Sequence, residues 1–232
     1  MKGLPDSKIY EQGLKYWPYA DSWKRAFNYI CDNTPINGTL IDLMCGPGYL
    51  LKKLQLKRKD LELSGVDIDK RYILYAKKTY PKIKFELADI LKWKFNNKYD
   101  VVICTGSLHH IIYNKQEKVI RKMASMVKKN GFVLISDCCI DPYLKESQRM
   151  LNAAKLGYEY IKETIKNGAP SSIIGPTIDI LYNDVLMKEF KTSPDKRIML
   201  LEKIFKKVEI FKTWPKFKSE YGDYIFICRN IR

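Results

Sequence analysis

Carboxylates stand where two apolar runs of the sequence end. Asp67 follows the run Leu61 to Val66, and Asp89 follows the run Ile83 to Leu87. The carboxyl ends of parallel strands meet at one edge of a sheet, where a carboxylate accepts hydrogen bonds from ribose hydroxyls. Because no phosphate-binding lysine loop accompanies them, the pair predicts an adenosine compound that is not strongly anionic. S-adenosylmethionine, which carries a cationic sulfonium, suits such carboxylates.

Two glycines stand where an apolar run turns into a helical one, in the stretch TLIDLMCGPGYLLKKL (Thr39 to Leu54). Gly46 and Gly48 lack Cβ atoms, so a ligand can approach the backbone N–H groups at the start of a helix. A dinucleotide fingerprint needs a third glycine, and Leu51 stands in its place. The turn therefore favours a ligand other than NAD or FAD.

The two histidines of the chain, His109 and His110, are adjacent and follow the apolar run Val101 to Cys104. A histidine at the edge of a site can act as a general base when the nucleophile is a hydroxyl. The alternative is structural, in which the pair positions the helix that follows. His109 is the candidate base, and His110 is a candidate substrate contact.

Four aromatic residues crowd the N-terminal segment, namely Tyr10, Tyr16, Trp17 and Tyr19. Aromatic faces attract a sulfonium or a cationic amine, by about 0.5–2 kcal/mol when the cation is desolvated. The alternative is that these side chains only hold an amphipathic segment against the sheet. They are candidates for the substrate site or its lid.

Short apolar runs alternate with longer helical stretches, which is typical of parallel strands joined by crossover helices. We expect a Rossmann-like, doubly wound α/β sheet flanked by helices. The runs Val208–Phe211 and Tyr224–Cys228 lie too close for a crossover helix, so they are expected to pair antiparallel and to leave the last strand antiparallel. The expected parallel strands are Leu40–Met44, Leu61–Val66, Ile83–Leu87, Val101–Cys104 and Phe132–Ser136.

The 232 residues are expected to form a single domain. Residues 1–36 are expected to form an N-terminal helical arm that is broken near Pro18. Between the fifth and sixth strands, the segment at about residues 141–193 shows helical periodicity in two parts, separated by the loop NGAPSSIIGP. This insertion is a candidate substrate lid. The alternative is a helical pair that only packs against the sheet.

The net charge of +16 comes mostly from lysines that are scattered along the sequence. Scattered lysine is typical of a solvated surface, and binding of a polyanion is the alternative. The six cysteines include no C-x-x-C pair and are expected to be reduced. No run of about 18 apolar residues exists, and the start MKGLPDSK lacks the apolar region of a secretory signal. We therefore expect a cytoplasmic protein without a membrane segment.

These motifs, in this order, resemble the class I S-adenosylmethionine-dependent methyltransferase family. LIDLMCGPGYL resembles the first motif of the family, D-L-G-C-G-x-G, with Met44 in place of its first glycine. GVDID resembles the second motif, LADI the third, YDVVICTGSLHHI the fourth strand and its loop, and MVKKNGFVLISD the fifth strand. The match runs from about Leu40 to Asp137. It implies the cofactor S-adenosyl-L-methionine.

The resemblance also implies which residues hold the cofactor. Asp67 would hold the ribose diol, with Ile68 against the adenine face. Asp89 would accept from the adenine amine, with Ile90 beside the ring. The residues that would border the methionine part are Asp42, Cys45, Gly46, Gly48, Cys104 and Thr105. Asp137 and Asp141 resemble part of the metal site of catechol-type enzymes, but the rest of that pattern is not visible, so no metal is expected.

The predicted reaction is in-line transfer of a methyl group to an oxygen or nitrogen of a small molecule. The arm and the insertion could close over such an acceptor and exclude water. An RNA or protein methyltransferase is one alternative, motivated by the charge of +16, although CTGSLHH stands where nucleic-acid amine methyltransferases have [DN]-P-P-[YF]. A catalytically silent, cofactor-binding partner subunit is another alternative, motivated by Met44.

Overall fold

A single sheet of seven strands forms the centre of the computed structural model, which describes residues 6–186 and 189–232. The first five residues of the expected arm and residues 187–188 of the expected insertion lie outside the described residues. The strands are β1 (Thr39–Leu43), β2 (Glu62–Asp67), β3 (Lys84–Leu87), β4 (Tyr99–Thr105), β5 (Val127–Cys139), β6 (Phe205–Trp214) and β7 (Gly222–Ile231).

The strand order is β3-β2-β1-β4-β5-β7-β6, and β7 runs antiparallel to both of its neighbours. The remaining pairings, β3 with β2, β2 with β1, β1 with β4 and β4 with β5, are parallel. The expected doubly wound sheet with an antiparallel last strand is therefore confirmed. Strands β5 and β6 extend beyond the apolar runs that predicted them.

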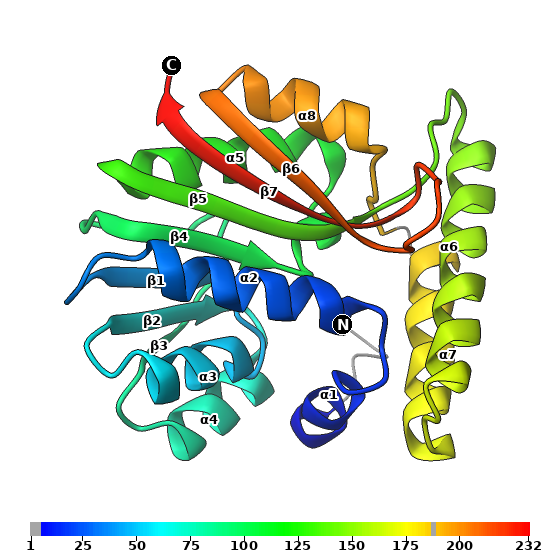
Figure 1. Cartoon of the computed structure of the whole chain (residues 1–232), viewed down its shortest axis with the longest axis horizontal. Helices are drawn as coiled ribbons and strands as arrows, with labels where there is room; N and C mark the ends of the chain where they lie inside the picture. The colour runs from blue at the N-terminus through cyan, green and yellow to red at the C-terminus, as the bar shows by residue number, and fades with distance from the viewer. Residues whose placement is uncertain (1–5, 187–188) are drawn as a thin grey trace.

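The helices form three groups around the sheet (Figure 1). One group covers one face, a second group covers the other, and a third stands beside the edge at which the parallel strands end. The first group is α2 (Tyr19–Asn33), α3 (Tyr49–Lys57) and α4 (Lys70–Thr79), the second is α5 (Tyr113–Met126) and α8 (Pro194–Glu202), and the third is α6 (Glu146–Lys166) and α7 (Ser171–Leu186). Helix α8 was not among the expected elements.

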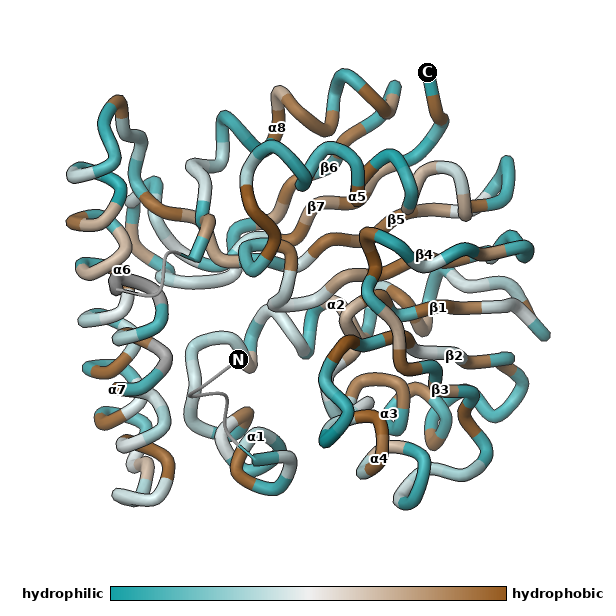
Figure 2. The backbone as a smooth tube through the Cα atoms, turned by 180° about the vertical axis from the view of Figure 1, so that it is seen from behind, coloured by the Kyte–Doolittle hydropathy of each residue, from teal (hydrophilic) through white to brown (hydrophobic). Residues whose placement is uncertain are grey.

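The core lies on both faces of the sheet because successive strand residues point to opposite sides. Ile41 of β1 packs in the cluster that includes α5 and α8, whereas its neighbour Leu40 packs in the cluster that includes α2, α3 and α4. Val102 and Val101 of β4 divide in the same way. Figure 2 shows that hydrophobic residues concentrate in the strands. Burial on both faces explains the continuous apolar runs of the sequence.

The N-terminal segment is broken at Pro18, as predicted. Helix α1 (Ser7–Gly13) ends before it, and Pro18 is the cap that precedes α2. Helix α2 buries Ala26 and Ile30 against the sheet, so it belongs to the layer on that face. Helix α1 instead lies near α7 (Figure 1). The expected arm is thus divided between the core and the surroundings of α7.

The expected insertion contains the antiparallel helical pair α6 and α7, which stand side by side (Figure 1). Ala153 and Leu156 of α6 pack against Trp214 and Tyr221, which flank the loop between β6 and β7. In the part of the chain that the structure describes, no helix has the length and apolar character needed to cross a membrane.

Candidate functional site

A cavity of about 430 Å³ lies where β1, β2 and β4 end, within the range of small-molecule pockets. We call its wall along the ends of β1, β2 and β3 the strand side. The opposite wall, built from the turn after β4, the end of β5, α6 and the segment after α7, is the insertion side. The predicted site residues that line the cavity are Asp42, Cys45, Gly46, Asp67, Ile68, Asp89, Ile90, Thr105, Tyr10, Trp17, Tyr19, His109 and His110.

The turn between β1 and α3 forms the floor of the strand side. The N–H of Gly46 donates to Oδ2 of Asp67 at 2.8 Å, and the N–H of Cys45 donates to the carbonyl of Val66. Gly46 has φ of +53°, and no atom lies within 4 Å of the position that its Cβ would take. The glycine therefore leaves its backbone open to a ligand, and left-handed φ costs it no strain.

Asp67 holds the end of β2 and the turn of β1 together. Its other oxygen, Oδ1, accepts from the N–H of Asp69 at 2.7 Å. Burial raises the pKa of Asp67, and the hydrogen bonds from Asp69 and Gly46 oppose that rise. A carboxylate oxygen has more than one lone-pair site, so both oxygens can also accept from the hydroxyls of a ligand.

Asp42 is the buried carboxylate of the strand side. Its side chain lines the cavity, the residue is 1% exposed, and no described group hydrogen-bonds Oδ1. Burial raises the pKa of Asp42 well above its ordinary value, and the nearby Asp67 adds to the rise. An unpartnered buried carboxylate costs free energy unless a cationic group approaches it. The site therefore fits a ligand that carries positive charge.

The end of β3 supplies the far part of the strand side. Oδ1 of Asp89 accepts from the N–H of Leu91 at 2.9 Å, and this bond orients the carboxylate. Ile90 is buried beside it, whereas Ile68 after β2 is 56% exposed although it lines the cavity. An apolar side chain left open in a cavity provides a surface for a flat ring. The roles of Asp89, Ile68 and Ile90 as adenine contacts stay a prediction.

Met44 adopts φ of +61° in the turn where the resembling motif has glycine. Its carbonyl accepts from Oγ of Ser107 at 3.1 Å, and Ser107 also donates to the carbonyl of Thr105. The turn thus keeps the left-handed conformation that glycine adopts freely, at the cost of backbone strain. Met44 itself lines the cavity.

Three predicted site residues are not among those that line the cavity. Gly48 has φ of +78°, and a Cβ there would meet the ring of Phe85 at 2.6 Å. Glycine is therefore needed at this position so that the start of α3 can pack against β3. Cys104 is fully buried within β4. The carbonyl of Tyr16 accepts from Asn167 at 2.8 Å, which attaches the turn before α2 to the end of α6.

Three of the N-terminal aromatic residues, Tyr10, Trp17 and Tyr19, form part of the cavity wall. Tyr10 and Trp17 meet edge to face, with ring centroids 5.7 Å apart. The indole N–H of Trp17 donates to Oγ1 of Thr177 on α7 at 2.9 Å, so the wall is joined to the insertion. Burial raises the pKa of Tyr10 to about 12. The Tyr10 phenol is therefore neutral near pH 7, and the residue lines the cavity.

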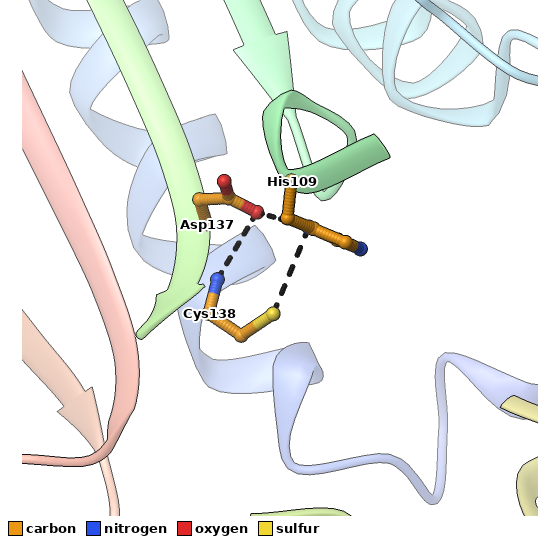
Figure 3. Close-up of side chains that lie close together, drawn as sticks. All are labelled: His109, Asp137 and Cys138. Atoms are coloured by element: carbon orange, nitrogen blue, oxygen red, sulfur yellow. Dashed lines mark hydrogen bonds and ion pairs between the residues drawn. The ribbon is translucent and has the colours of Figure 1, made fainter. Parts of the chain in front are cut away.

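His109 lies on the insertion side with both ring nitrogens facing carboxylates. Nδ1 is 2.5 Å from Oδ1 of Asp137, and Nε2 is 3.3 Å from Oε2 of Glu189. Figure 3 shows Asp137 and Cys138, at the end of β5, directed toward His109. Burial disfavours a charged imidazole, but Cys138 and Asp137 outweigh it and raise the pKa of His109 well above its ordinary value. The base role of His109 stays a prediction, and this geometry favours an imidazolium that already holds its proton.

Asp137 is the buried partner of that imidazolium. Burial opposes its charge, but His109 and then Arg197 outweigh the effect and lower the pKa of Asp137. The guanidinium of Arg197 lies 3.5 Å from Oδ2, and both residues are almost fully buried. The three groups therefore form an internal charge network between the turn after β4, β5 and α8.

Glu189 brings the segment after α7 to the two histidines. Its Oε1 lies 3.1 Å from Nδ1 of His110. His109, His110 and Glu189 form one group with metal-ligand spacing, and His109, Asp137 and Cys138 form another. The ammonium of Lys191 lies 3.5 Å from Oε2 of Glu189 and competes with a metal cation for it. The expectation that no metal is used stays a prediction.

Further residues line the insertion side that were not predicted, including Cys138, Tyr160, Glu189 and Lys191. Cys138 follows the fifth apolar run, so the strand-end argument that found Asp67 could have found it too. Tyr160 lies within a helical stretch and Glu189 follows another. Nothing local in the sequence distinguishes them from surface residues.

A family model described as a methyltransferase domain matches residues 36–208. A protein of Invertebrate iridescent virus 6 named as methyltransferase 235L is 34% identical over 99 residues, which cover 43% of this chain and 37% of that protein. This chain thus matches little more than a third of that relative. The carboxy-S-adenosyl-L-methionine synthase of Campylobacter lari is 28% identical over 210 residues and covers 86% of each chain.

Among solved structures, the plantazolicin methyltransferase BpumL, in complex with a monoazolic desmethylPZN analog and SAH, matches with a TM-score of 0.64. The sequence identity is 14%, and the match covers 96% of this chain and 89% of that chain. At this identity the likeness shows a shared fold. With the family match over most of the sequence, the chain belongs to the class I S-adenosylmethionine-dependent methyltransferases, and S-adenosylmethionine is its cofactor.

Proposed function

We propose that this chain transfers the methyl group of S-adenosylmethionine to an oxygen or nitrogen of a small molecule that is held on the insertion side of the cavity. The observation that carries the proposal is the covered cavity. Residues of α6 and α7 line it together with the strand ends and the N-terminal aromatic residues. An acceptor in this space is surrounded by protein, which suits a compact molecule better than an RNA or a folded protein.

The residues of the strand side fit the cofactor. Oδ1 of Asp42 has no hydrogen-bond partner among the described residues, so it can accept a hydrogen bond from the ammonium group of the cofactor. The Gly46 turn and Asp67 line the cavity and would hold the ribose, and Asp89 and Ile68 line it and would hold adenine. S-adenosylmethionine, when bound, supplies a methyl group on a cationic sulfonium. The chain then has to hold the acceptor in line with that group and exclude water.

The aromatic part of the wall indicates how the chain would assist the transfer. Tyr10, Trp17 and Tyr19 are buried or half-buried aromatic residues on the cavity wall, and Trp17 is bonded to α7. Removing water from around two reactants strengthens every electrostatic contact between them and the wall. Orienting the reactants supplies the larger part of the rate when the methyl group is already activated.

A second candidate is carboxylation of S-adenosylmethionine itself, in which a carboxylic acid gives up its carboxyl group to the methyl carbon and takes up the proton that this carbon loses. It is motivated by the Campylobacter lari relative and by Lys191. The product would place a new carboxylate near the sulfonium, and the ammonium of Lys191 lines the cavity. Against this candidate, Glu189 lies 3.5 Å from that ammonium, and Asp42 is a second carboxylate on the wall. The charge of the described wall is better matched to an unmodified sulfonium.

One experiment separates these candidates. Wild type and Asp67→Ala are titrated with S-adenosylmethionine, then incubated with it and with small amines, phenols, carboxylic acids or RNA, and the products are read by mass spectrometry. We expect micromolar binding to wild type and a methylated acceptor that Asp67→Ala does not produce. A carboxylated cofactor would favour the second candidate. Absence of cofactor binding to wild type, or methylation of added RNA alone, would contradict the proposal.

A further inference from the structure

A buried tyrosine–carboxylate pair lies behind the insertion side of the cavity. Tyr160 of α6 lines the cavity, and its Oη lies 2.5 Å from both carboxylate oxygens of Asp223 on β7. Asp223 is fully buried and is not among the residues that line the cavity. The phenol therefore separates the carboxylate from the space in which the acceptor would lie.

The sheet places this pair at the edge that carries the rest of the site. Asp223 pairs in register with Cys138, so β7 begins beside the carboxyl end of β5. The ring of Tyr160 meets Trp214 edge to face, with centroids 4.9 Å apart. The backbone carbonyl of Asp223 accepts from Oγ1 of Thr213 at 3.1 Å. Both members are thus held by contacts with the end of β6.

Titratable groups from several elements face Asp223. They are the neutral phenol of Tyr160 on α6, Asp137 on β5, Lys191 after α7 and His109 after β4. Burial raises the pKa of Asp223 to about 7, and the nearby Asp137 adds to the rise. Burial raises the pKa of Tyr160 well above its ordinary value. Near neutral pH the carboxylate can take up a proton, whereas the phenol keeps its own.

This pair is better suited to accept a proton than His109 is. Both ring nitrogens of His109 face carboxylates, and its imidazolium already holds the proton that a base would have to accept. Tyr160, by contrast, has a hydroxyl that can receive one proton on the cavity side while it passes another to Asp223. Movement of two protons along a hydrogen-bonded pair creates no buried phenolate.

We propose that Tyr160 and Asp223 form a proton relay that deprotonates the methyl acceptor, a step that rests on the proposed function. A lone pair of the acceptor forms the new bond to the methyl carbon, and the electrons of the carbon–sulfur bond go to sulfur, which leaves S-adenosylhomocysteine. The proton of the acceptor passes to Oη of Tyr160, and the proton of Tyr160 passes to Asp223. Tyr160 is the group that touches the acceptor, and Asp223 acts through it.

The test uses Tyr160→Phe, Asp223→Asn and the control Tyr158→Phe, which changes an exposed tyrosine on the same helix. Turnover of the acceptor found in the screen is measured against pH, with thermal melting and S-adenosylhomocysteine affinity as controls for folding. We expect Tyr160→Phe and Asp223→Asn to lower kcat by about 10²-fold. Affinity for S-adenosylhomocysteine should stay within about twofold, and Tyr158→Phe should behave as wild type. Wild-type activity should rise with pH to a plateau above about 7, and this rise should vanish in Asp223→Asn.

An infrared measurement tests the pair without any acceptor. The difference spectrum between wild type and Asp223→Asn, both with S-adenosylhomocysteine, should show a protonated carboxyl band that titrates near pH 7 and shifts its midpoint in Tyr160→Phe. A carboxylate that stays ionised between about pH 5 and pH 9 would overturn the relay. So would wild-type kcat in Tyr160→Phe. If wild type binds S-adenosylmethionine but methylates no acceptor in the screen, the proposed function fails, and the infrared titration still decides whether Asp223 exchanges a proton near neutral pH.

Discussion

The two sides of the cavity are built over different distances along the chain. On the strand side, the bond from Gly46 to Asp67 joins residues 21 positions apart, across two neighbouring parallel strands. On the insertion side, His109 and Asp137 are 28 positions apart, and Tyr160 and Asp223 are 63 apart. The residues of the strand side lie close together because they follow neighbouring strands that are also near one another in the sequence. The insertion side depends on segments that meet only when the whole chain has folded.

The largest effect is expected on the insertion side, from loss of His109. Substitution of His109→Ala leaves Asp137 buried with the hydrogen bond from the N–H of Cys138 and the looser contact to Arg197, and a buried charge that has lost its closest cationic partner is costly. We expect the free energy of unfolding to fall by about 3 kcal/mol, measured by urea denaturation. The neighbouring His110→Ala is the control and should cost less, because the pKa of His110 is lowered by burial and its ring is neutral.

The pH dependence of the His109–Asp137 ion pair makes the prediction for His109→Ala more specific. The pKa of His109 is raised, so its contribution to stability is present below its ordinary value of 6.5 and is lost as the pH rises through the raised value. The pKa of Asp137 is lowered, so its contribution is present above 3.8 and is lost as the pH falls through the lowered value. The gap between wild type and His109→Ala should be widest between these pH values. A gap that does not change with pH would mean that the pair is not ionised.

The next effect is expected on the strand side, from Asp67→Ala. The change removes the acceptor for the N–H groups of Gly46 and Asp69 and the expected ribose contact. Hydrogen bonds to a charged group contribute about 1.5–3 kcal/mol each, so affinity for S-adenosylhomocysteine should fall by about 10²-fold in calorimetry. Tyr160→Phe is the comparison and should bind nearly as wild type does. An equal loss of affinity for S-adenosylhomocysteine in Asp67→Ala and Tyr160→Phe would show that both sides of the cavity contribute to cofactor binding.

The sequence predicted the strand side because parallel strands follow a simple rule. Each strand ends at the same edge, so a polar residue after an apolar run faces the same cavity, as Asp67 and Asp89 do. The rule does not say which glycine faces the ligand. Gly46 lines the cavity, whereas Gly48 is a glycine because Phe85 occupies the space of a Cβ. Phe85 lies on another strand, so the motif around Gly48 does not show this contact.

The insertion side could not be predicted from local pattern. The helical periodicity of α6 showed that a helix forms but not that Tyr160 faces Asp223, because the angle at which α6 meets the sheet is set by tertiary packing. The role of His109 was predicted from its place after β4, and the sequence did not show that Glu189 would lie beside its second nitrogen. Pairing across such separations costs loop entropy and is fixed only by the complete fold.

A pH-dependent effect on stability is expected from Asp223→Asn. The pKa of the Asp223 carboxyl rises from 3.8 in the unfolded chain to about 7 in the fold, so folding takes up a proton between these values. The stability that this group contributes is therefore lost as the pH rises from about 3.8 to about 7, by up to about 1.4 kcal/mol per pH unit, and does not change further above that range. Asparagine does not ionise. The melting temperature of Asp223→Asn should therefore increase relative to that of wild type as the pH rises. Parallel curves would show that Asp223 is ionised throughout.

The smallest effect tests whether the strand side keeps its shape without the glycine of the resembling motif. Met44 holds φ of +61°, a region that costs a residue with a Cβ about 1–2 kcal/mol. Met44→Ala and Met44→Gly both remove the side chain, but only glycine removes the strain. We expect Met44→Gly to be about 1 kcal/mol more stable than Met44→Ala in urea denaturation. The same pair of changes at Lys53, exposed within α3, should reverse the order, because glycine inside a helix is less stable than alanine by about 1 kcal/mol. If Met44→Gly and Met44→Ala were equally stable, the turn would not depend on left-handed φ, and the strand side would owe its shape to Asp67 and Gly46 alone.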